Sequence, residues 1–538
     1  MRRLLATGIV LSLSALGLAT TARGDRLLGT AGPDRLLGTL MPDTLLGRGG
    51  NDFLAGRGGR DVLSGGPDDD RIAAQADGAV DRVLCGSGRD IVTAELSDRV
   101  AADCEVVSRQ LSRDTLTGER SQHQTQVEPS SAASGSTIVT VFQSGRHLGG
   151  GADGIGFATS RDAGATWRSG FLPQEAGVDT ISDPVVAYDA RHRVWLATSL
   201  SEAEGSGGDL GLGIFVNRSA DGISWGAPVD AATDPTERYD KEWIACDNWA
   251  SSPFRGRCYL TYLDFARSAI STRRSLDGGL TWSAPVAVRP AETTSGIMNG
   301  PQPVVRPDGA VIVPFAIWVS FDRTDQIGAL RSTDGGVTFD APTRIARLVN
   351  EEVAGMRAPP FPSAAVDAGG TVYVAWSDAR YRDEATADDI VLATSRDGLT
   401  WSQPALVPIE EQGSTTDLFV PALAVDPATS GRAAHVAVTY HALPQEGGCG
   451  YLLPTCTGGV DVGVITSNDG GQTWKRPQRL TAEPMRLLAM ADGDIGRMVG
   501  DYIATSFVRG RAVPVFSLAS PPVAGELRQA IFAVTKLS

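Results

Sequence analysis

The stretch "RSLDGGLTWSAP", residues 274–285, contains an octapeptide of which this chain carries six copies. The copies are SRDAGATW from Ser160, SADGISW from Ser219, SLDGGLTW from Ser275, STDGGVTF from Ser332, SRDGLTW from Ser395 and SNDGGQTW from Ser467. Each copy follows an alternating segment such as DIVLATS and precedes another short apolar segment. An acidic, glycine-rich segment between two such runs predicts a hairpin turn between β-strands.

The residue types of the octapeptide suit a structural turn better than a site of chemistry. The aspartate can accept backbone N–H bonds, the glycines can adopt positive φ, and the final aromatic can bury beside the strands. Catalysis at these turns would require six equivalent sites. A calcium loop needs more oxygen ligands than one aspartate and one hydroxyl supply. The pattern therefore predicts scaffold.

The octapeptide resembles the Asp box, or BNR repeat, of the sialidase-like β-propellers, and the resemblance covers roughly residues 120–538. It implies an all-β fold in which four-stranded blades repeat around an axis. Apolar segments suited to innermost strands lie at 127–132, 182–189, 240–246, 301–306, 360–367, 419–426 and 498–507. Seven blades are therefore favoured over six, with the last blade closed by a strand from the N-terminal side. Sialidases have six blades, which weakens a direct transfer of their function.

A second repeat lies nearer the N-terminus and has a period of nine residues. Its aspartates are Asp25, Asp34, Asp43, Asp52, Asp61 and Asp70, each followed two positions later by Leu or Ile. This period suits a parallel β-roll, in which the aliphatic residue is buried and the glycine-rich turn offers oxygen ligands to a hard cation. A disordered Gly/Asp linker is the alternative interpretation.

The nonapeptides resemble the hemolysin-type, or RTX, calcium-binding family, most clearly in "GRGGNDFLAGRGGRDVLSGGPDDD", residues 47–70. The resemblance implies Ca²⁺ as the cofactor. The ligand candidates are Asp43, Asp52, Asp61 and Asp70. Thr30, Thr39, Arg48 and Arg57 stand where the family often has a second glycine, and Pro33 and Pro42 remove backbone donors. The early turns are therefore expected to bind calcium weakly or only to stack.

The N-terminus and the cysteines indicate a secreted protein. Two arginines, an apolar run and small residues up to Ala22 predict a signal peptide over 1–22, with a membrane anchor as the alternative. The expected regions are then a roll over 23–104, a linker over 105–122 and a propeller over 123–538. The cysteines fall into three local pairs expected to be disulfides, Cys85–Cys104, Cys246–Cys258 and Cys449–Cys456.

The formal net charge is −15, from 48 basic and 63 acidic residues. This balance argues against a nucleic acid or an anionic membrane surface as the partner. No segment after the signal peptide is apolar enough to span a membrane. A glycan or glycoprotein is the expected ligand, and the sequence indicates no particular oligomeric state.

Propeller ligands gather at the mouth of the central channel, where the loops entering the innermost strands converge. Here those loops carry Glu128, Asp183, Arg238, Tyr239, Asp240, Glu242, Asn299, Arg357, Asp417, Arg497, Asp501 and Tyr502. One interpretation is that these residues solvate the rim and pair with one another.

The resemblance to sialidases implies a second interpretation, hydrolysis of a sialoside. That family binds the substrate carboxylate with three arginines and uses a tyrosine nucleophile, a glutamate base and an aspartate acid. The candidates are Asp153 as acid, Tyr502 and Glu242 as nucleophile and base, and Arg238, Arg357 and Arg497 as a substitute clamp. The family's Arg-Ile-Pro is replaced by "VEPSS", residues 127–131, so Glu128 would repel a carboxylate there.

Two function hypotheses follow. The leading one is a secreted, sialidase-like propeller directed at carbohydrate, with exo-α-sialidase as the activity that the resemblance implies. The competing one is a non-catalytic extracellular module that binds a glycan or a protein. The acidic segment 376–390, with Asp378, Asp388 and Asp389, is a weaker calcium candidate for which a solvated loop is the favoured interpretation.

Overall fold

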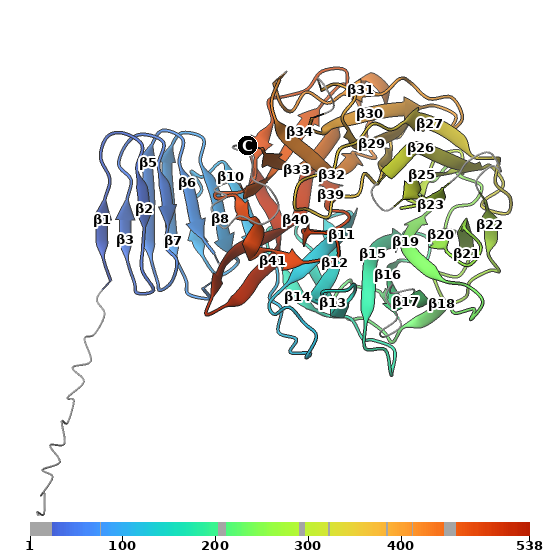
Figure 1. Ribbon diagram of the computed structural model, residues 1–538, viewed down its shortest axis with the longest axis horizontal. Coiled ribbons are helices and arrows are strands. Elements are labelled where there is room, and N and C mark those ends of the chain that lie inside the picture. Colours follow the sequence, from blue (N-terminus) through green and yellow to red (C-terminus); the bar gives the residue numbers. More distant parts are fainter. Residues whose placement is uncertain are drawn as a thin grey trace, which may run out of the picture.

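The computed structural model describes residues 24–538 apart from 76, 203–210, 290–295, 321–322, 383–385, 412 and 446–458. The chain forms an elongated roll followed by a ring of small antiparallel sheets (Figure 1). The fold is therefore all-β, with a parallel roll ahead of a propeller-like domain, as the two repeats predict. In the described residues, no helix is long and apolar enough to cross a membrane.

The roll is a parallel coil of two sheets. One sheet contains β1 (Arg26–Leu28), β3 (Thr44–Leu46), β5 (Val62–Pro67), β7 (Arg82–Ser87) and β9 (Arg99–Val100). The other contains β2 (Arg35–Leu37), β4 (Phe53–Ala55), β6 (Arg71–Ala74), β8 (Ile91–Glu95) and β10 (Val106–Gln110). The aliphatic residue of each nonapeptide faces inward, and Leu45, Leu54, Leu63 and Ile72 are fully buried in one core. The nonapeptide period thus produces a roll and not a linker.

Two of the three predicted disulfides lie in the described residues, and both are formed. Cys85 bonds Cys104 with an S–S distance of 2.02 Å, and Cys246 bonds Cys258 with an S–S distance of 2.03 Å. The third predicted pair, Cys449–Cys456, lies outside the described residues. The first bond joins the later turns of the roll.

The segment 105–122, expected to be a linker, has structure of its own. Its residues 106–110 form β10, which is parallel to β8 and antiparallel to β41 (Glu526–Leu537). One eight-stranded sheet therefore runs from the roll into the ring without a break. The polar composition of the segment predicts a linker, but Ser108 and Gln110 are buried in a strand because their side chains form hydrogen bonds there.

In the residues that the structure describes, the ring divides into seven antiparallel strand groups. The first group contains β11 (Gln126–Ser134), β12 (Thr137–Arg146), β13 (Ala152–Ser160) and β14 (Arg168–Phe171). The second contains β15 (Ile181–Asp189), β16 (Val194–Glu202), β17 (Gly211–Ser219) and β18 (Val229–Ala232). The third contains β19 (Tyr239–Cys246), β20 (Cys258–Asp264), β21 (Ala269–Ser275) and β22 (Val286–Val288). The fourth contains β23 (Ile297–Asn299), β24 (Val304–Val305), β25 (Val311–Ser320), β26 (Arg323–Ser332) and β27 (Thr343–Arg347). The fifth contains β28 (Ser363–Val366), β29 (Val372–Asp378), β30 (Asp389–Ser395) and β31 (Ala405–Leu406).

The sixth and seventh groups complete the circle. The sixth is β32 (Thr416–Val425), β33 (Val436–Pro444), β34 (Gly459–Ser467), β35 (Gln478–Arg479) and β36 (Met485–Arg486), and the seventh is β39 (Ala504–Val508), β40 (Arg511–Val523), β41 and β10. A short pair, β37 (Ala491–Asp492) and β38 (Arg497–Met498), lies between them in sequence. The seventh group thus takes its outer strand from the N-terminal side of the ring.

The octapeptides are hairpin turns whose aspartate is satisfied within the turn. Asp277 accepts hydrogen bonds from the backbone N–H of Leu280 and Thr281, and its second oxygen accepts from Thr281 Oγ1 at 2.6 Å. These bonds outweigh burial and lower the pKa of Asp277 to about 2. The same pKa, about 2, holds for Asp221, Asp334, Asp397 and Asp469. The turns are therefore complete without a metal ion or a ligand.

Each of five turns is also bound by an arginine of the preceding group. The bonds are Arg161 to Asp221 O, Arg218 to Gly278 O, Arg257 to Gly335 O, Arg331 to Asp397 O and, closing the ring, Arg511 to Ala163 O. Hydrogen bonds from a charged guanidinium are stronger than those between neutral groups. The octapeptides thus fix one strand group to the next.

Candidate functional site

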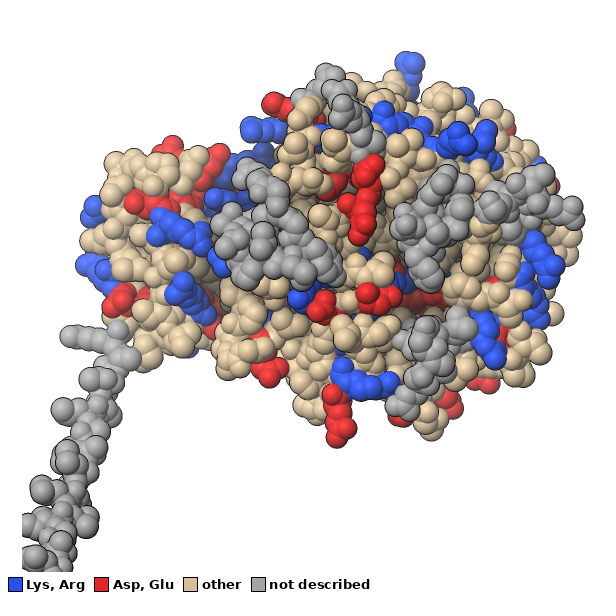
Figure 2. Space-filling view, in the orientation of Figure 1, with Lys and Arg blue, Asp and Glu red and all other residues tan. Residues whose placement is uncertain are grey.

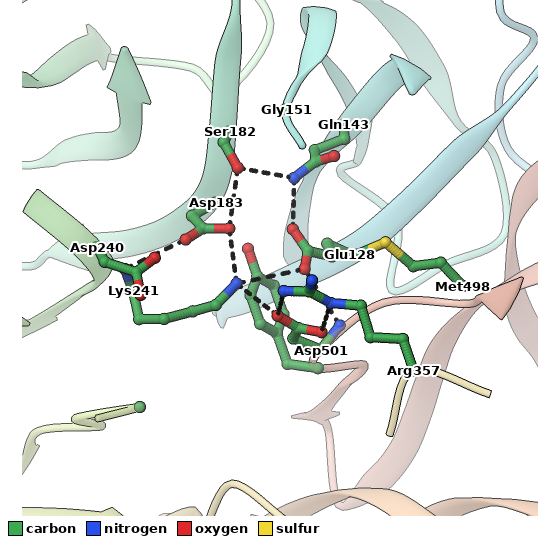
Figure 3. Close-up of polar contacts among 12 residues, drawn as sticks. Glu128, Gln143, Gly151, Ser182, Asp183, Asp240, Lys241, Arg357, Met498 and Asp501 are labelled. Atoms are coloured by element: carbon green, nitrogen blue, oxygen red, sulfur yellow. Dashed lines mark hydrogen bonds and ion pairs between the residues drawn. The ribbon is translucent and has the colours of Figure 1, made fainter. Parts of the chain in front are cut away.

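The innermost strands of three neighbouring groups carry a bulge at the same place. The register shifts beside Glu128 in β11, Asp183 in β15 and Lys241 in β19, and these residues have φ values of 55°, 48° and 49°. Left-handed φ is uncommon for residues with a Cβ and persists where surrounding structure imposes it. Figure 3 shows that the three side chains converge between their strands.

Lys241 is the centre of a buried charge cluster. Its Nζ lies 2.6 Å from Asp501 Oδ2, 3.0 Å from Asp183 Oδ1 and 3.6 Å from Glu128 Oε1. Arg357 approaches Asp501 from the other side, with Nε to Oδ1 and Nη2 to Oδ2 both 2.7 Å (Figure 3). Such a two-point pair fixes the guanidinium plane. Its Nη1 also binds Asp494 at 2.8 Å, so little of Arg357 remains for a ligand.

Acidic groups outnumber basic ones in this cluster, and the pKa values of several carboxyl groups are shifted. Burial raises the pKa of Glu128 to about 7 and that of Asp240 to about 6, against the opposing charge of Lys241. Arg357 and Lys241 overcome burial at Asp501 and hold its pKa well below the usual range. Acidic side chains are also visible over the centre of the ring (Figure 2). The axial mouth therefore disfavours a ligand with a carboxylate.

A narrow pocket opens beside the cluster. Glu242, Trp243 and Tyr502 line it, and its free volume is only about 30 Å³. Neither carboxylate oxygen of Glu242 has a hydrogen-bond partner among the described residues, although both are buried. Burial and the charge of Asp183 raise the pKa of Glu242 well above its ordinary value. Trp243 packs edge-on against Tyr502, with ring centroids 5.2 Å apart.

Two of the three predicted catalytic residues meet in this pocket. Tyr502 and Glu242 share it, and the Tyr502 hydroxyl donates to the carbonyl of Pro184 at 3.1 Å. Asp153 does not line the pocket. Its carboxylate lies 2.8 Å from His147 Nε2 and accepts from the Gly118 N–H at 2.9 Å.

The three predicted clamp arginines have separate partners. Arg357 joins the axial cluster, whereas Arg238 donates to the carbonyls of Pro235 and Glu237. The Arg497 guanidinium donates to the Met490 carbonyl and lies 3.4 Å from Asp492, although the Arg497 backbone pairs with Arg357. No described carboxylate or cavity brings the three guanidinium groups together.

The sequence reasoning overlooked Lys241. Its signal is positional, because Lys241 in "DKEWIAC" occupies the place of Glu128 in "VEPSSA" and Asp183 in "SDPVVAYD". The other acidic candidates, Asp378 and Asp389, are buried and paired with Arg380 and Arg382 at 2.6 Å each, which differs from the solvated loop that was expected.

The roll supplies a second kind of site, built from aspartates in which one carboxylate oxygen receives no hydrogen bond. Asp52, Asp61 and Asp70 each accept one backbone N–H through Oδ1, from the residue eighteen positions earlier. Their Oδ2 atoms are buried and have no partner among the described residues. A Cβ on Gly47, Gly56 or Gly65 would lie 2.2, 2.3 or 2.1 Å from the respective Oδ2, so glycine leaves each oxygen its space.

The electrostatics of these turns fit a hard divalent cation. Burial, reinforced by neighbouring carboxylates, raises the pKa of Asp61 and Asp70 to about 7 and that of Asp81 to about 8. Oxygens of Asp61, Asp77 and Asp81 all lie within 4.8 Å of one another, although Asp77 belongs to a longer turn outside the nine-residue period. Ca²⁺ prefers such oxygen ligands and would offset their repulsion.

The early turns fall into two kinds, although the sequence predicts weak calcium binding for all of them. The Thr39 backbone N–H and Oγ1 both donate to Asp43 Oδ2, at 2.5 and 3.0 Å. Thr30 does the same for Asp34. Where Arg48 and Arg57 replace threonine, the backbone takes φ values of 80° and 74° and the aspartate keeps its second oxygen free. Threonine thus fills the place that a cation takes in the later turns.

A comparison with known families agrees with the roll. A family model for the RTX calcium-binding nonapeptide repeat (4 copies) matches residues 37–72, and these repeats bind Ca²⁺. No curated protein matches the chain. A protein of unknown function from Dyadobacter fermentans is similar in structure, with 20% identity, a TM-score of 0.43, and coverage of 67% of this chain and 99% of that one.

Two carbohydrate-active proteins are also distantly similar in structure. A PL25 ulvan lyase bound to -[GlcA(1-4)Rha3S]- has 11% identity and a TM-score of 0.46, covering 80% of this chain and 96% of that one. The Hadza microbial sialidase Hz136 has 16% identity and a TM-score of 0.39, covering 77% of this chain and 66% of that one.

Proposed function

We propose that this chain is a secreted, seven-bladed Asp-box propeller with a calcium-binding roll, and that its axial pocket binds a neutral glycan without hydrolysing sialosides. The seven strand groups, the six octapeptides and the closure of the last group by β10 support the propeller. The apolar N-terminal run and the two disulfides support secretion.

The observation that carries the binding proposal is that both buried oxygens of Glu242 lack a hydrogen-bond partner among the described residues. A buried polar atom without a partner costs about 1–3 kcal/mol, which a ligand hydroxyl would recover by forming a hydrogen bond with it. Trp243 and Tyr502 add aromatic surface of the kind that packs against a sugar ring. Because the pocket is narrow, it suits a hydroxyl or hydroxymethyl group at the end of a glycan.

The geometry favours binding over sialoside hydrolysis. Hydrolysis by the sialidase route needs three arginines around one carboxylate, and here Arg357 is already held by Asp501 and Asp494. Burial and nearby carboxylates raise the pKa of Tyr502 well above its ordinary value, which keeps the phenol protonated. The meeting of Tyr502 with Glu242 remains the one feature in favour of a hydrolase.

A glycan array and a turnover assay test the two functions separately. The full chain with calcium should bind one or more neutral glycans, and Glu242→Ala or Trp243→Ala should weaken that binding about tenfold. The matched control is Glu526→Ala, at an exposed glutamate that does not line the pocket, and it should bind as wild type. Absence of binding to every neutral glycan would contradict the proposal.

The turnover assay uses a fluorogenic sialoside with wild type and Tyr502→Phe. Neither should release the fluorophore faster than buffer. Turnover by wild type that disappears in Tyr502→Phe would establish the hydrolase instead.

A further inference from the structure

A separate cleft lies where the second sheet of the roll meets the sixth strand group. Residues of its lining include Arg35, Phe53, Arg71, Ala482, Glu483 and Arg486, and its volume is about 350 Å³. Small-molecule sites fall within about 300–1,000 Å³ and occur preferentially between domains. This cleft shares no lining residue with the axial pocket.

The roll contributes a row of three side chains to the cleft. Arg35, Phe53 and Arg71 stand opposite one another on β2, β4 and β6, which are neighbouring parallel strands. Each directly follows a repeat aspartate, and because that position alternates with the buried aliphatic, it faces away from the core of the roll. Phe53 is nevertheless buried, because it packs against Ala482 of the ring. The guanidinium carbon of Arg35 lies 4.2 Å from the centre of the Phe53 ring. The nonapeptide period therefore lines up cation, aromatic ring and cation along one face.

The ring contributes a third arginine and a single acid. Glu483 pairs with Arg35 at 2.9 Å, and Arg486 comes from β36. The guanidinium groups of Arg71 and Arg486 make no hydrogen bond or ion pair that the described residues show. Asp461, whose charge also reaches Arg71, is already bound by Arg479 at 2.5 Å.

The balance of charge in the cleft is opposite to that of the whole protein. Three guanidinium groups face one carboxylate in a chain whose net charge is −15. Local positive potential of this kind attracts and orients anions. Guanidinium groups also match the planar or tetrahedral oxygens of carboxylate, sulfate and phosphate with paired hydrogen bonds.

We propose that this cleft binds an oxyanion-bearing ligand the size of a mono- or disaccharide. Arg71 and Arg486 bind the anionic group. Phe53 and Ala482, which are 5% and 0% exposed, pack against each other and form the floor of the cleft beneath the ligand. Arg35, held by Glu483 and stacked on Phe53, orients that ring. The ligand chemistry is a sulfate, phosphate or carboxylate group, either free or carried on a sugar.

Binding in this cleft depends on calcium in the roll. Phe53 and Arg71 directly follow Asp52 and Asp70, whose free oxygens belong to the calcium turns. Without the cation these carboxylates repel one another, and the strands β4 and β6, which carry Phe53 and Arg71, become less stable. The cleft therefore couples ligand binding to the calcium level outside the cell.

Isothermal titration of the full, calcium-loaded chain tests the proposal with four probes. They are inorganic sulfate, inorganic phosphate, a sulfated disaccharide and the same disaccharide without sulfate. We expect the sulfated disaccharide to bind, its neutral counterpart not to bind, and chelation of calcium to abolish the signal. Equal affinity for inorganic sulfate would show that the site takes the free anion, whereas no binding of any oxyanion would overturn the proposal.

Variants locate the binding site. Arg71→Ala and Arg486→Ala should each weaken binding of the sulfated disaccharide about tenfold or more. Arg71→Lys keeps the charge but not the paired donors, so it should fall between Arg71→Ala and wild type. Arg26→Ala is the matched control, because Arg26 also follows a repeat aspartate but lies in the other sheet. Unchanged binding in both alanine variants would overturn the proposal even if Arg71→Ala also disturbed the roll, because Arg486 belongs to the ring.

Discussion

The nonapeptide turns of the roll and the octapeptide turns of the ring are both built from aspartate, glycine and small polar residues. In the octapeptide, Asp277 receives donors on both oxygens from its own turn, and its pKa falls to about 2. In the nonapeptide, Asp61 receives one backbone donor, keeps the other oxygen free, and its pKa rises to about 7. The number of local donors therefore decides whether a repeated aspartate is complete in itself or requires a cation.

The roll shows the same rule within a single repeat. Thr39 donates twice to Asp43, so that turn resembles an octapeptide in chemistry although it belongs to a nonapeptide. Asp52 lacks such a threonine and keeps its oxygen free. The contrast between the two repeats thus depends on individual donors and not on the overall composition of each region.

The largest expected effect is that of pH on the calcium-free roll. The raised pKa values of Asp61, Asp70 and Asp81 mean that the folded roll binds protons more tightly than the unfolded chain. This contribution to stability is fully present below about pH 4 and is lost as the pH rises through about 7 to 8. Thermal unfolding of dialysed, calcium-free protein should show a more stable roll at about pH 5 than at about pH 8.

Calcium should reverse that order, because the ion requires ionised carboxylates and its affinity rises with pH. A calcium-free roll that is equally stable at both pH values would break the contrast with the octapeptides. The octapeptide aspartates, with pKa values lowered to about 2, contribute stability that is present above about pH 4 and lost only in strong acid.

The next effect is the loss of a single nonapeptide ligand. Asp70→Asn keeps the acceptor for the Asp52 N–H but removes the charge that Ca²⁺ needs. At saturating calcium we expect the free energy of unfolding of the roll to fall by about 3 kcal/mol. The exposed neighbour Asp69→Asn is the control, and calorimetry with and without calcium measures both. Equal destabilisation of Asp70→Asn in the presence and absence of calcium would contradict the assignment.

A smaller effect is expected in the ring. Asp277→Ala removes the hydrogen bonds from Leu280 and Thr281 and should lower the free energy of unfolding by about 2 kcal/mol. Thr281→Val deletes only the side-chain bond and should cost about 1 kcal/mol. Denaturant unfolding should give the same values with and without calcium. A calcium-dependent loss would mean that the octapeptide also binds metal.

The smallest effect belongs to the nonapeptide turns capped by threonine. Asp34→Asn should leave the number of bound calcium ions unchanged and alter the free energy of unfolding by less than about 0.5 kcal/mol. The reason is that Thr30 already donates two hydrogen bonds to the Asp34 carboxylate. Counting bound Ca²⁺ by titration distinguishes this variant from Asp61→Asn. A lost ion in Asp34→Asn would show that threonine does not replace the cation.

The periodic features of the molecule were predictable from the sequence. A nine-residue spacing of Asp and Leu places Leu54 and Leu63 in one core, and six octapeptides mark hairpins, because both patterns repeat a local conformation. The strand β10 was not predictable, since its place depends on pairing with β41 more than 400 residues later. Local composition carries no record of such a contact.

The axial site was predictable only in part. Tyr502 and Glu242 come together because both lie at the entry of inner strands, where repeated topology brings side chains to the axis. The partners of Arg238 and Arg497 depend on nearby carbonyls and on Asp492, which no motif specifies. Lys241 was not predicted because its position on the axis becomes evident only when the sequences of the inner strands are aligned with one another.

Hydrogen exchange of the full chain at about pH 7.5, compared with and without calcium, tests the central claim most directly. Removing calcium should speed exchange in roll strands β3 to β6 by about a hundredfold or more, because opening no longer competes with ion binding. Exchange in the octapeptide turn at residues 275–282 should stay the same. Equal protection of the roll in both conditions, or an equal loss in the octapeptide turns, would contradict the account.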